Sequence, residues 1–351
     1  MNGSFNTGNS MKVATYYRND DVRVEEIDKP EISSKEILVK VIASGICGSD
    51  VMEWYRIKSA PRVLGHEIAG EIVETGEEVE DYEEGQRVFV SHHVPCGECR
   101  YCRDGHTSVC DTLRSTNFYP GGFSEYIRVP EINVEKGVYL LPDEMSYEEG
   151  VFIEPLACVV RGQDFAEIEE DNSVMVIGSG ISGLLHIQLA KAKGASKVLA
   201  TDLKDYRLDA AEKLGADQVF KADELTPEKI KRANDGLLAD RVIVCAGAVP
   251  AMEQAFKSVG RGGKILLFAP LKPDESVPLP VWELWKDEVT ITTSYAAGEN
   301  DINEAIRLID SRSIDVNKMI THQFSMEETS KGFQLVAEAD ESIKVIIKPH
   351  E

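Results

Sequence analysis

Four of the seven cysteines lie within fifteen residues, with the spacing C-x2-C-x2-C-x7-C. They are Cys96, Cys99, Cys102 and Cys110. Four thiolates at this spacing can surround one tetrahedral metal ion, and zinc suits four sulfur ligands without redox chemistry. The sequence therefore predicts a closed structural zinc lobe at residues 95–111, which forces this loop to fold back on itself.

Two other interpretations of the cysteine lobe stay open. Disulfides are disfavoured because neighbouring C-x-x-C pairs would close small, strained loops, and no secretory signal is recognisable before them. An iron–sulfur cluster also uses three close cysteines and a fourth. Zinc fits the spacing better than either alternative.

Length and charge narrow the classes of protein. A chain of 351 residues with 42% hydrophobic residues can fill two domain cores. Its formal net charge of −23 repels nucleic-acid phosphates and anionic membranes, and no apolar run is long enough to span a bilayer. We expect neither a nucleic-acid nor a membrane partner. An odd number of cysteines, several in metal-like positions, indicates a reducing compartment, so a cytoplasmic location is expected.

The first half of the chain has a β-rich pattern. Short β-branched runs broken by glycine, proline and acidic turns predict a β domain over residues 11–155. The expected strands include Ile37–Ile42, Ile68–Val73, Arg87–Val90 and Tyr126–Val129. Residues 1–10 are small and polar, and we expect a flexible extension there.

Residues 156–295 have a different pattern, in which short apolar strands alternate with helical stretches such as Ile181–Lys193 and Tyr206–Leu214. The expected strands are Val174–Ile177, Val198–Thr201, Gln218–Phe220, Val242–Cys245, Ile265–Phe268 and Val289–Thr292. This alternation predicts a doubly wound parallel sheet, so the fold class is α/β. In residues 296–351, a helix at Ile302–Ile309 and a β-like run at Ser342–Ile347 are expected to return to the first domain.

A glycine-rich turn follows the strand Val174–Ile177 and opens a helix. Its residues are Gly178, Ser179, Gly180, Ile181, Ser182 and Gly183. In this context the turn predicts a dinucleotide site with the pyrophosphate at the helix N-terminus. Asp202 ends the next strand and should accept hydrogen bonds from the adenosine ribose, which favours NAD because a carboxylate repels a 2′-phosphate. Lys204 and Arg207 lie close enough to leave NADP open.

A second set of metal-binding residues lies outside the cysteine lobe. It comprises Cys47, His66, Glu67 and Glu154. Each alone is more often an ordinary core or polar residue than a ligand. Together they supply sulfur, nitrogen and oxygen donors for a zinc ion that keeps an open position, as a catalytic site requires.

Several motifs occur in a fixed order along the chain. GHEIAG at Gly65–Gly70, followed by Gly76 and Val79, fits the signature G-H-E-x2-G-x5-G-x2-V. The other motifs are GICGSD, the cysteine lobe, GGFSEY, FIEPL, the dinucleotide turn and AGA at Ala246–Ala248. In these motifs, over Met11–His350, the chain resembles the zinc-containing medium-chain alcohol and polyol dehydrogenases. The resemblance is nearest to the branch of sorbitol, threonine and galactitol-1-phosphate dehydrogenases.

This resemblance implies a GroES-like catalytic domain, a Rossmann domain for NAD, and two zinc ions per chain. Cys47 and His66 are then ligands of the catalytic zinc, and Glu67 or Glu154 completes the set directly or through water. Asp50 is expected to orient His66 by hydrogen bonding.

The resemblance also implies that Ser49 hydrogen-bonds the substrate alcohol and begins a proton relay. Met52 stands where many relatives have a histidine that passes the proton to solvent, so the exit path stays open. Aromatic residues are candidates for the pocket rim, namely Trp54, Tyr55, Phe118 and Tyr119. Arg56 and Lys58 are available for a phosphate group.

The implied activity is reversible oxidation of a secondary alcohol, with hydride passing to the nicotinamide of NAD. An uncharged polyol is the preferred substrate, followed by a sugar phosphate and then a 3-hydroxy amino acid. A homodimer or homotetramer is expected from the family. A protein that senses NAD without turnover is the alternative from another class, and the open metal set argues against it.

Overall fold

The computed structural model describes residues 10–339 and 341–351. The expected N-terminal extension therefore lies outside the described residues, except that Ser10 already belongs to a strand. By its internal contacts the chain divides into two compact units. Unit 1 contains the described residues up to Glu154 together with Ala297–Asp310 and Val316–Glu351, and unit 2 contains Pro155–Ala296 and Ser311–Asp315.

The sheet of unit 2 has six parallel strands. Their spatial order is β11 (Gln218–Lys221), β10 (Lys197–Asp202), β9 (Ser173–Ile177), β12 (Ala239–Val244), β13 (Val259–Leu267) and β14 (Thr290–Thr293). The chain starts in the middle at β9, moves to one edge and then crosses to the other, which is the order of a doubly wound sheet. The predicted α/β fold and its six strands are confirmed.

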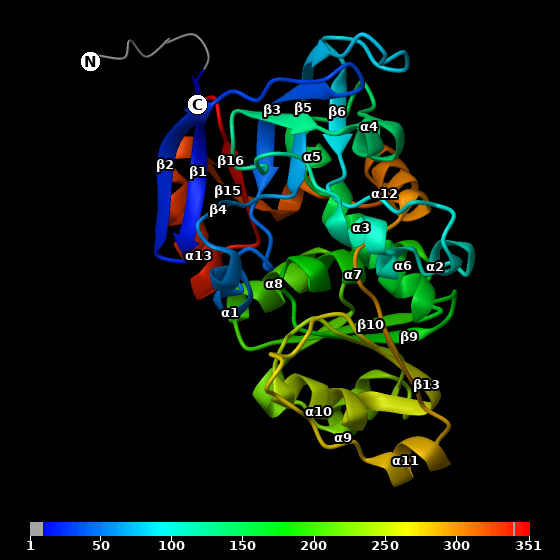
Figure 1. The fold of residues 1–351 in the computed structure, drawn as a ribbon. Coiled ribbons are helices and arrows are strands. Elements are labelled where there is room, and N and C mark those ends of the chain that lie inside the picture. The colour runs from blue at the N-terminus through cyan, green and yellow to red at the C-terminus, as the bar shows by residue number, and fades with distance from the viewer. Residues whose placement is uncertain (1–9, 340) are drawn as a thin grey trace. The chain divides into compact units, whose positions relative to one another are not determined.

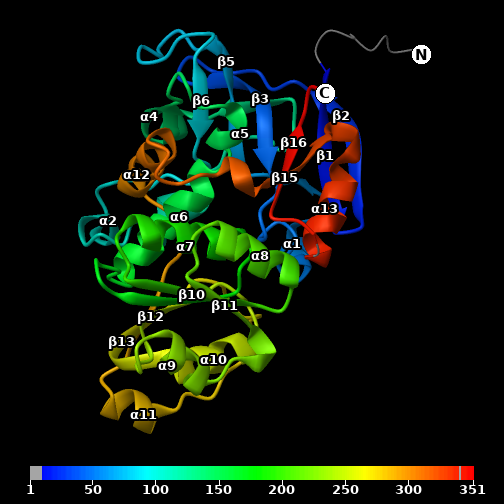
Figure 2. The same ribbon diagram turned by 180° about the vertical axis from the view of Figure 1, so that it is seen from behind.

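Helices cover both faces of this sheet (Figure 1). α7 (Ile181–Ala192) and α8 (Asp205–Lys213) lie on one face, and α9 (Pro227–Ala233) and α10 (Val249–Ser258) lie on the other, as Figure 2 also shows. All residues of β9 are buried, as expected for a central strand covered on both faces.

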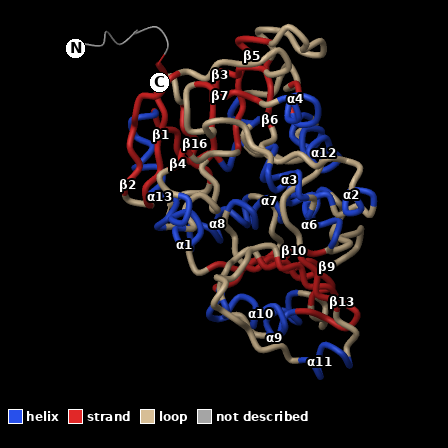
Figure 3. Tube along the Cα trace, viewed as in Figure 1, coloured by secondary structure: helices blue, strands red, loops and turns tan. Residues whose placement is uncertain are grey.

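Unit 1 is built on two sheets, which Figure 3 shows as red segments. The larger has the order β15 (Ile320–Ser325), β16 (Lys344–Lys348), β3 (Ile37–Gly45), β5 (Glu67–Thr75), β6 (Arg87–Val90) and β8 (Val138–Leu140), with β7 (Tyr126–Val129) also paired to β3. The smaller has the order β2 (Asp21–Asp28), β1 (Ser10–Arg18) and β4 (Arg62–Val63). Because β16 pairs with β3, the C-terminal run lies in the same sheet as β3 (Figure 2).

The remaining helices lie between the strands along the chain. They are α1 (Glu53–Arg56), α2 (Arg100–Arg103), α3 (Asp111–Ser115), α4 (Glu131–Gly137), α5 (Tyr147–Gly150), α6 (Ile153–Phe165), α11 (Val281–Lys286), α12 (Glu299–Asp310) and α13 (Thr329–Glu338). Across residues 10–339 and 341–351, none of the helices combines the length and apolar character needed to cross a bilayer.

Candidate metal centres and dinucleotide turn

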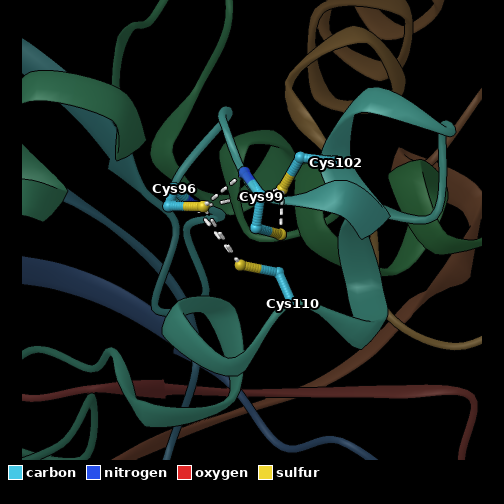
Figure 4. Close-up of side chains that lie close together, drawn as sticks. All are labelled: Cys96, Cys99, Cys102 and Cys110. Atoms are coloured by element: carbon cyan, nitrogen blue, oxygen red, sulfur yellow. Dashed lines mark hydrogen bonds between the residues drawn. The ribbon is translucent and has the colours of Figure 1, made fainter.

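The four cysteines of the lobe point their sulfur atoms toward one another (Figure 4). The Cys99–Cys102, Cys96–Cys110 and Cys96–Cys102 sulfur pairs are 3.5, 3.6 and 3.9 Å apart. A tetrahedron with Zn–S bonds of about 2.3 Å places its sulfurs about 3.8 Å apart, so the lobe fits a zinc ion. The structure places no disulfide among these four cysteines, so the disulfide interpretation of the lobe is not adopted.

Backbone amides prepare the lobe for thiolates. The amides of Cys99 and Cys96 donate to the sulfurs of Cys96 and Cys110, at 3.3 and 3.5 Å. Burial acts to raise the pKa of Cys110, but amide donors from Cys96 and Leu113 outweigh it and lower the pKa to about 6. Backbone donors also lower the pKa of Cys96, whereas burial raises that of Cys102 to about 12, so the amides favour the metal-binding thiolate form at Cys96 and Cys110.

The second cluster forms where β3 and β5 meet. These strands are antiparallel and place Gly45 opposite Glu67. Cys47 follows Gly45 by two residues and His66 precedes Glu67, so all three metal-binding side chains reach the same end of the strand pair. One ligand atom from each of Cys47, His66 and Glu67 lies within 4.8 Å of the others. This is a mixed sulfur, nitrogen and oxygen donor set that suits zinc.

The turn before His66 depends on a glycine. Gly65 has a φ of 93°, and a Cβ atom there would lie 2.7 Å from the amide nitrogen of Phe123. L-residues with side chains rarely adopt this backbone conformation. Gly65 therefore sets the direction in which His66 leaves the turn.

Asp50 lies behind Cys47 and His66 and is fully buried. Its Oδ2 accepts the Cys47 amide at 3.1 Å, and its Oδ1 lies 3.5 Å from Nδ1 of His66. Burial acts to raise the pKa of Asp50, but the adjacent His66 and Arg56 lower it, so the group is a carboxylate. Asp50 thereby occupies Nδ1 and leaves Nε2 of His66 for a metal ion.

Glu67 has a partner that the sequence did not reveal. Its Oε2 accepts from Nζ of Lys344 in β16, and both side chains are buried. The Lys344 ammonium also lies 5.7 Å from the ring centre of Phe152. One Glu67 oxygen is thus held by a cation.

Glu154 is the other carboxylate that the sequence offered for this cluster. It lies in the first turn of α6 and is half-buried. Among the described residues, the group of mutually close ligand atoms contains Cys47, His66 and Glu67 but not Glu154. The geometry thus favours Glu67 over Glu154 as the third protein ligand.

Arg56 contacts Ser49, the residue expected to meet the substrate. Its Nη2 lies 3.0 Å from Ser49 Oγ and 3.3 Å from Asp50 Oδ1, and its Nε donates to the Ser49 carbonyl at 2.9 Å. The Ser49 amide in turn lies 3.4 Å from the sulfur of Cys47. Met52, which precedes α1, brings no titratable group to this network.

The expected rim aromatics divide into two groups. Tyr55 and Tyr119 are exposed and Trp54 is half-buried, as a pocket rim would allow. Phe118, in contrast, is a member of the hydrophobic core of the larger sheet and is buried, so its assignment to the rim is wrong. An aromatic residue in a loop has no sequence pattern that separates these two positions.

Two histidines beside the cluster were missed by the sequence analysis. The ring centres of His66 and His92 are 4.9 Å apart, and those of His92 and His93 are 3.8 Å apart. Burial lowers the pKa of His92 strongly and that of His93 to about 4, so both rings are neutral at pH 7. The adjacent pair His92-His93 just before the cysteine lobe was the available signal.

The glycine-rich turn of unit 2 connects β9 to α7 as predicted. Gly178 has a φ of 94°, and a Cβ atom on Gly183 would collide with the carbonyl oxygen of Gly178. The helix can therefore begin close to the strand only with glycine at these positions. Its first amides are then available to an anion.

Asp202 ends β10 beside this turn. Its two carboxylate oxygens accept the amides of Ser179 and Lys204, each at 2.9 Å. Arg207 lies 3.9 Å from Asp202 and about as far from the Cβ position of Gly180. The turn thus has a fixed carboxylate with one arginine next to it.

Comparisons with known proteins agree with this geometry. Residues 33–143 match the family described as alcohol dehydrogenase GroES-like domain, and residues 182–311 match the zinc-binding dehydrogenase family. Sorbitol dehydrogenase of Bacillus subtilis (strain 168) is 31% identical, over 97% of this chain and 98% of its own.

Two solved structures from Escherichia coli are also similar. Galactitol-1-phosphate dehydrogenase is 29% identical with a TM-score of 0.86, over 97% of this chain and 100% of its own. An alcohol dehydrogenase from strain CFT073, solved with NADH, has the same identity, TM-score and coverage.

Proposed function

Since the chain belongs to the zinc-containing medium-chain alcohol and polyol dehydrogenases, we propose that it moves hydride reversibly between a secondary alcohol of a polyol and NAD. The observation that carries this proposal is the convergence of Cys47, His66 and Glu67 at the end of β3 and β5. A purely structural site would be expected to close its ligand set with protein donors. Three donors leave one tetrahedral position for a substrate oxygen.

When bound, zinc would supply Lewis-acid stabilisation of negative charge on the substrate oxygen, and NAD would accept the hydride. The residues of this chain would prepare that chemistry. Asp50 holds the His66 ring in one orientation through Nδ1. Ser49 is proposed to offer its hydroxyl to the reacting oxygen, and the neutral rings of His92 and His93 add no charge beside the cluster.

NAD is favoured over NADP by Asp202. Both of its oxygens are fixed by backbone amides, so the carboxylate cannot easily turn away from a 2′-phosphate. Arg207 is the residue that would ease this repulsion, but its own charge is partly neutralised by the nearby Asp202 carboxylate. Similar solved structures hold NADH in one case and NADP in another, so the preference for NAD rests on Asp202.

The cysteine lobe is proposed to bind a structural zinc ion. Its sulfur spacings match a tetrahedral site, and four thiolates leave no position for substrate. Cys96, Cys99, Cys102 and Cys110 would therefore stabilise their loop and take no part in the reaction.

An uncharged polyol remains the preferred substrate. The Arg56 guanidinium, one of two cations considered for a phosphate, is engaged by Ser49 and Asp50. Of the two, only the exposed Lys58 would then be available to bind a phosphate group. The galactitol-1-phosphate relative keeps a sugar phosphate as the second candidate, and a 3-hydroxy amino acid is third.

The enzyme is also proposed to be a cytoplasmic homodimer or homotetramer. Four cysteines arranged for a metal ion suit a reducing compartment. Assembly is supported by α11, where Trp282 and Trp285 are 63% and 70% exposed, and by β14, which ends the strand order of its sheet.

A polyol panel tests the function. Protein mixed with NAD and sorbitol, galactitol, xylitol, arabitol phosphate or threonine should reduce NAD with at least one of these, and chelation should abolish the reaction until zinc is restored. The best member of the panel would identify the substrate class. Binding of NAD without turnover of any alcohol would instead support the sensor alternative.

A further inference from the structure

The Arg56 side chain touches both Ser49 and the Asp50 carboxylate. It is the last residue of α1, its side chain is 16% exposed, and its guanidinium lies 4.9 Å from the ring centre of Tyr55. Nε and Nη2 both bind Ser49, one at the carbonyl and one at the hydroxyl. Two bonds from one rigid fork fix the serine more firmly than one bond would.

These contacts determine what the Ser49 hydroxyl can do. A guanidinium only donates hydrogen bonds, so Ser49 Oγ must accept the bond from Arg56. The single hydroxyl proton is then free to point elsewhere, and one lone pair remains. Ser49 is two residues from Cys47 and its amide donates to the Cys47 sulfur, so the serine lies beside the metal cluster.

Arg56 also brings a permanent charge to this place. Arginine stays protonated at all ordinary pH values, so it cannot pass a proton onward. Its charge is partly balanced by Asp50, which is shared with His66. Arg56 thus connects the serine expected to meet substrate with the carboxylate that orients a metal ligand.

We propose that Arg56 is a positioning residue that fixes the Ser49 hydroxyl toward the reacting oxygen and favours negative charge there. The proposal rests on the proposed dehydrogenase function. In alcohol oxidation the proton of the hydroxyl group leaves to water and the hydride, with two electrons, goes to NAD. Arg56 neither gains nor loses a proton or an electron in this step. A role without proton transfer is compatible with Met52, which cannot relay a proton.

Three variants separate the two parts of this role. Arg56→Met removes both charge and donors, Arg56→Gln keeps an N–H donor without charge, and Arg56→Lys keeps charge without the fork. Arg62→Met is the matched control, because Arg62 is exposed and lies near enough to act on His92 through space. Zinc content and thermal midpoint show whether each variant is folded and loaded.

Two readouts are measured on each protein. The first is kcat and KM against pH with the best polyol of the panel. The second is calorimetric binding of trifluoroethanol in the presence of NAD, since this alcohol ionises readily and gives up hydride poorly. We expect Arg56→Met to lower kcat by about 10- to 100-fold with little change in KM, and to weaken trifluoroethanol binding by a similar factor. The loss in kcat should shrink at higher pH.

Arg56→Lys and Arg56→Gln should fall between Arg56→Met and the unchanged protein, and Arg62→Met should match the unchanged protein. A folded, zinc-loaded Arg56→Met with unaltered kcat and trifluoroethanol affinity would overturn the proposal. So would equal losses in Arg62→Met, since they would show a general effect of charge. Failure of the unchanged protein to oxidise any polyol would instead refute the dehydrogenase function. If the unchanged protein is active, the Arg56 variants test the role of Arg56 and leave the dehydrogenase function standing.

Discussion

Lys344 shows how a single buried residue can control a metal-binding side chain. It and Glu67 are both buried, and removing one partner of such a pair leaves an uncompensated charge that costs about 3–5 kcal/mol. We expect Lys344→Met to lower the free energy of unfolding of metal-stripped protein by about that amount, and Lys344→Met combined with Glu67→Gln to recover most of it. Urea denaturation checks both. An unchanged stability in Lys344→Met would show that the pair does not form.

At the level of elements, the sequence predicted the sheet of unit 2 well, because buried parallel strands are continuous apolar runs in the sequence, separated by helical segments. Strand β6 and strand β7 were also predicted with their observed bounds, Arg87–Val90 and Tyr126–Val129. The contacts of Lys344 with Glu67, 277 residues apart, and of Arg56 with Ser49 were not predictable. Both depend on how strands and turns meet in space, and neither leaves a local periodic pattern.

The exposed tryptophans of α11 give an element-scale prediction. Trp282 and Trp285 have ring centres 5.5 Å apart and form an apolar patch in unit 2 with Leu279 and Val281. Exposed apolar patches are often association surfaces. We expect Trp282→Ser with Trp285→Ser to shift the protein toward monomer in sedimentation velocity, with zinc content retained. A monomeric unchanged protein, or an unaltered oligomer in the double variant, would contradict this role for α11.

At the scale of the whole molecule, both metal clusters belong to unit 1 and the dinucleotide turn belongs to unit 2. The chemistry of the donors separates the two clusters. Four thiolates close one site, while Cys47, His66 and Glu67 leave the other open. We therefore propose that the first cluster contributes stability and that the second carries the reaction.

The most direct test of this assignment is to measure zinc content and NAD reduction together on Cys47→Ser and Cys99→Ser. We expect Cys47→Ser to keep the fold and the lobe zinc, lose the other zinc ion, and show no turnover. Cys99→Ser should mainly lower the thermal midpoint, with turnover in the fraction that stays folded. Turnover that survives Cys47→Ser, or a Cys47→Ser protein that retains both zinc ions, would contradict the account.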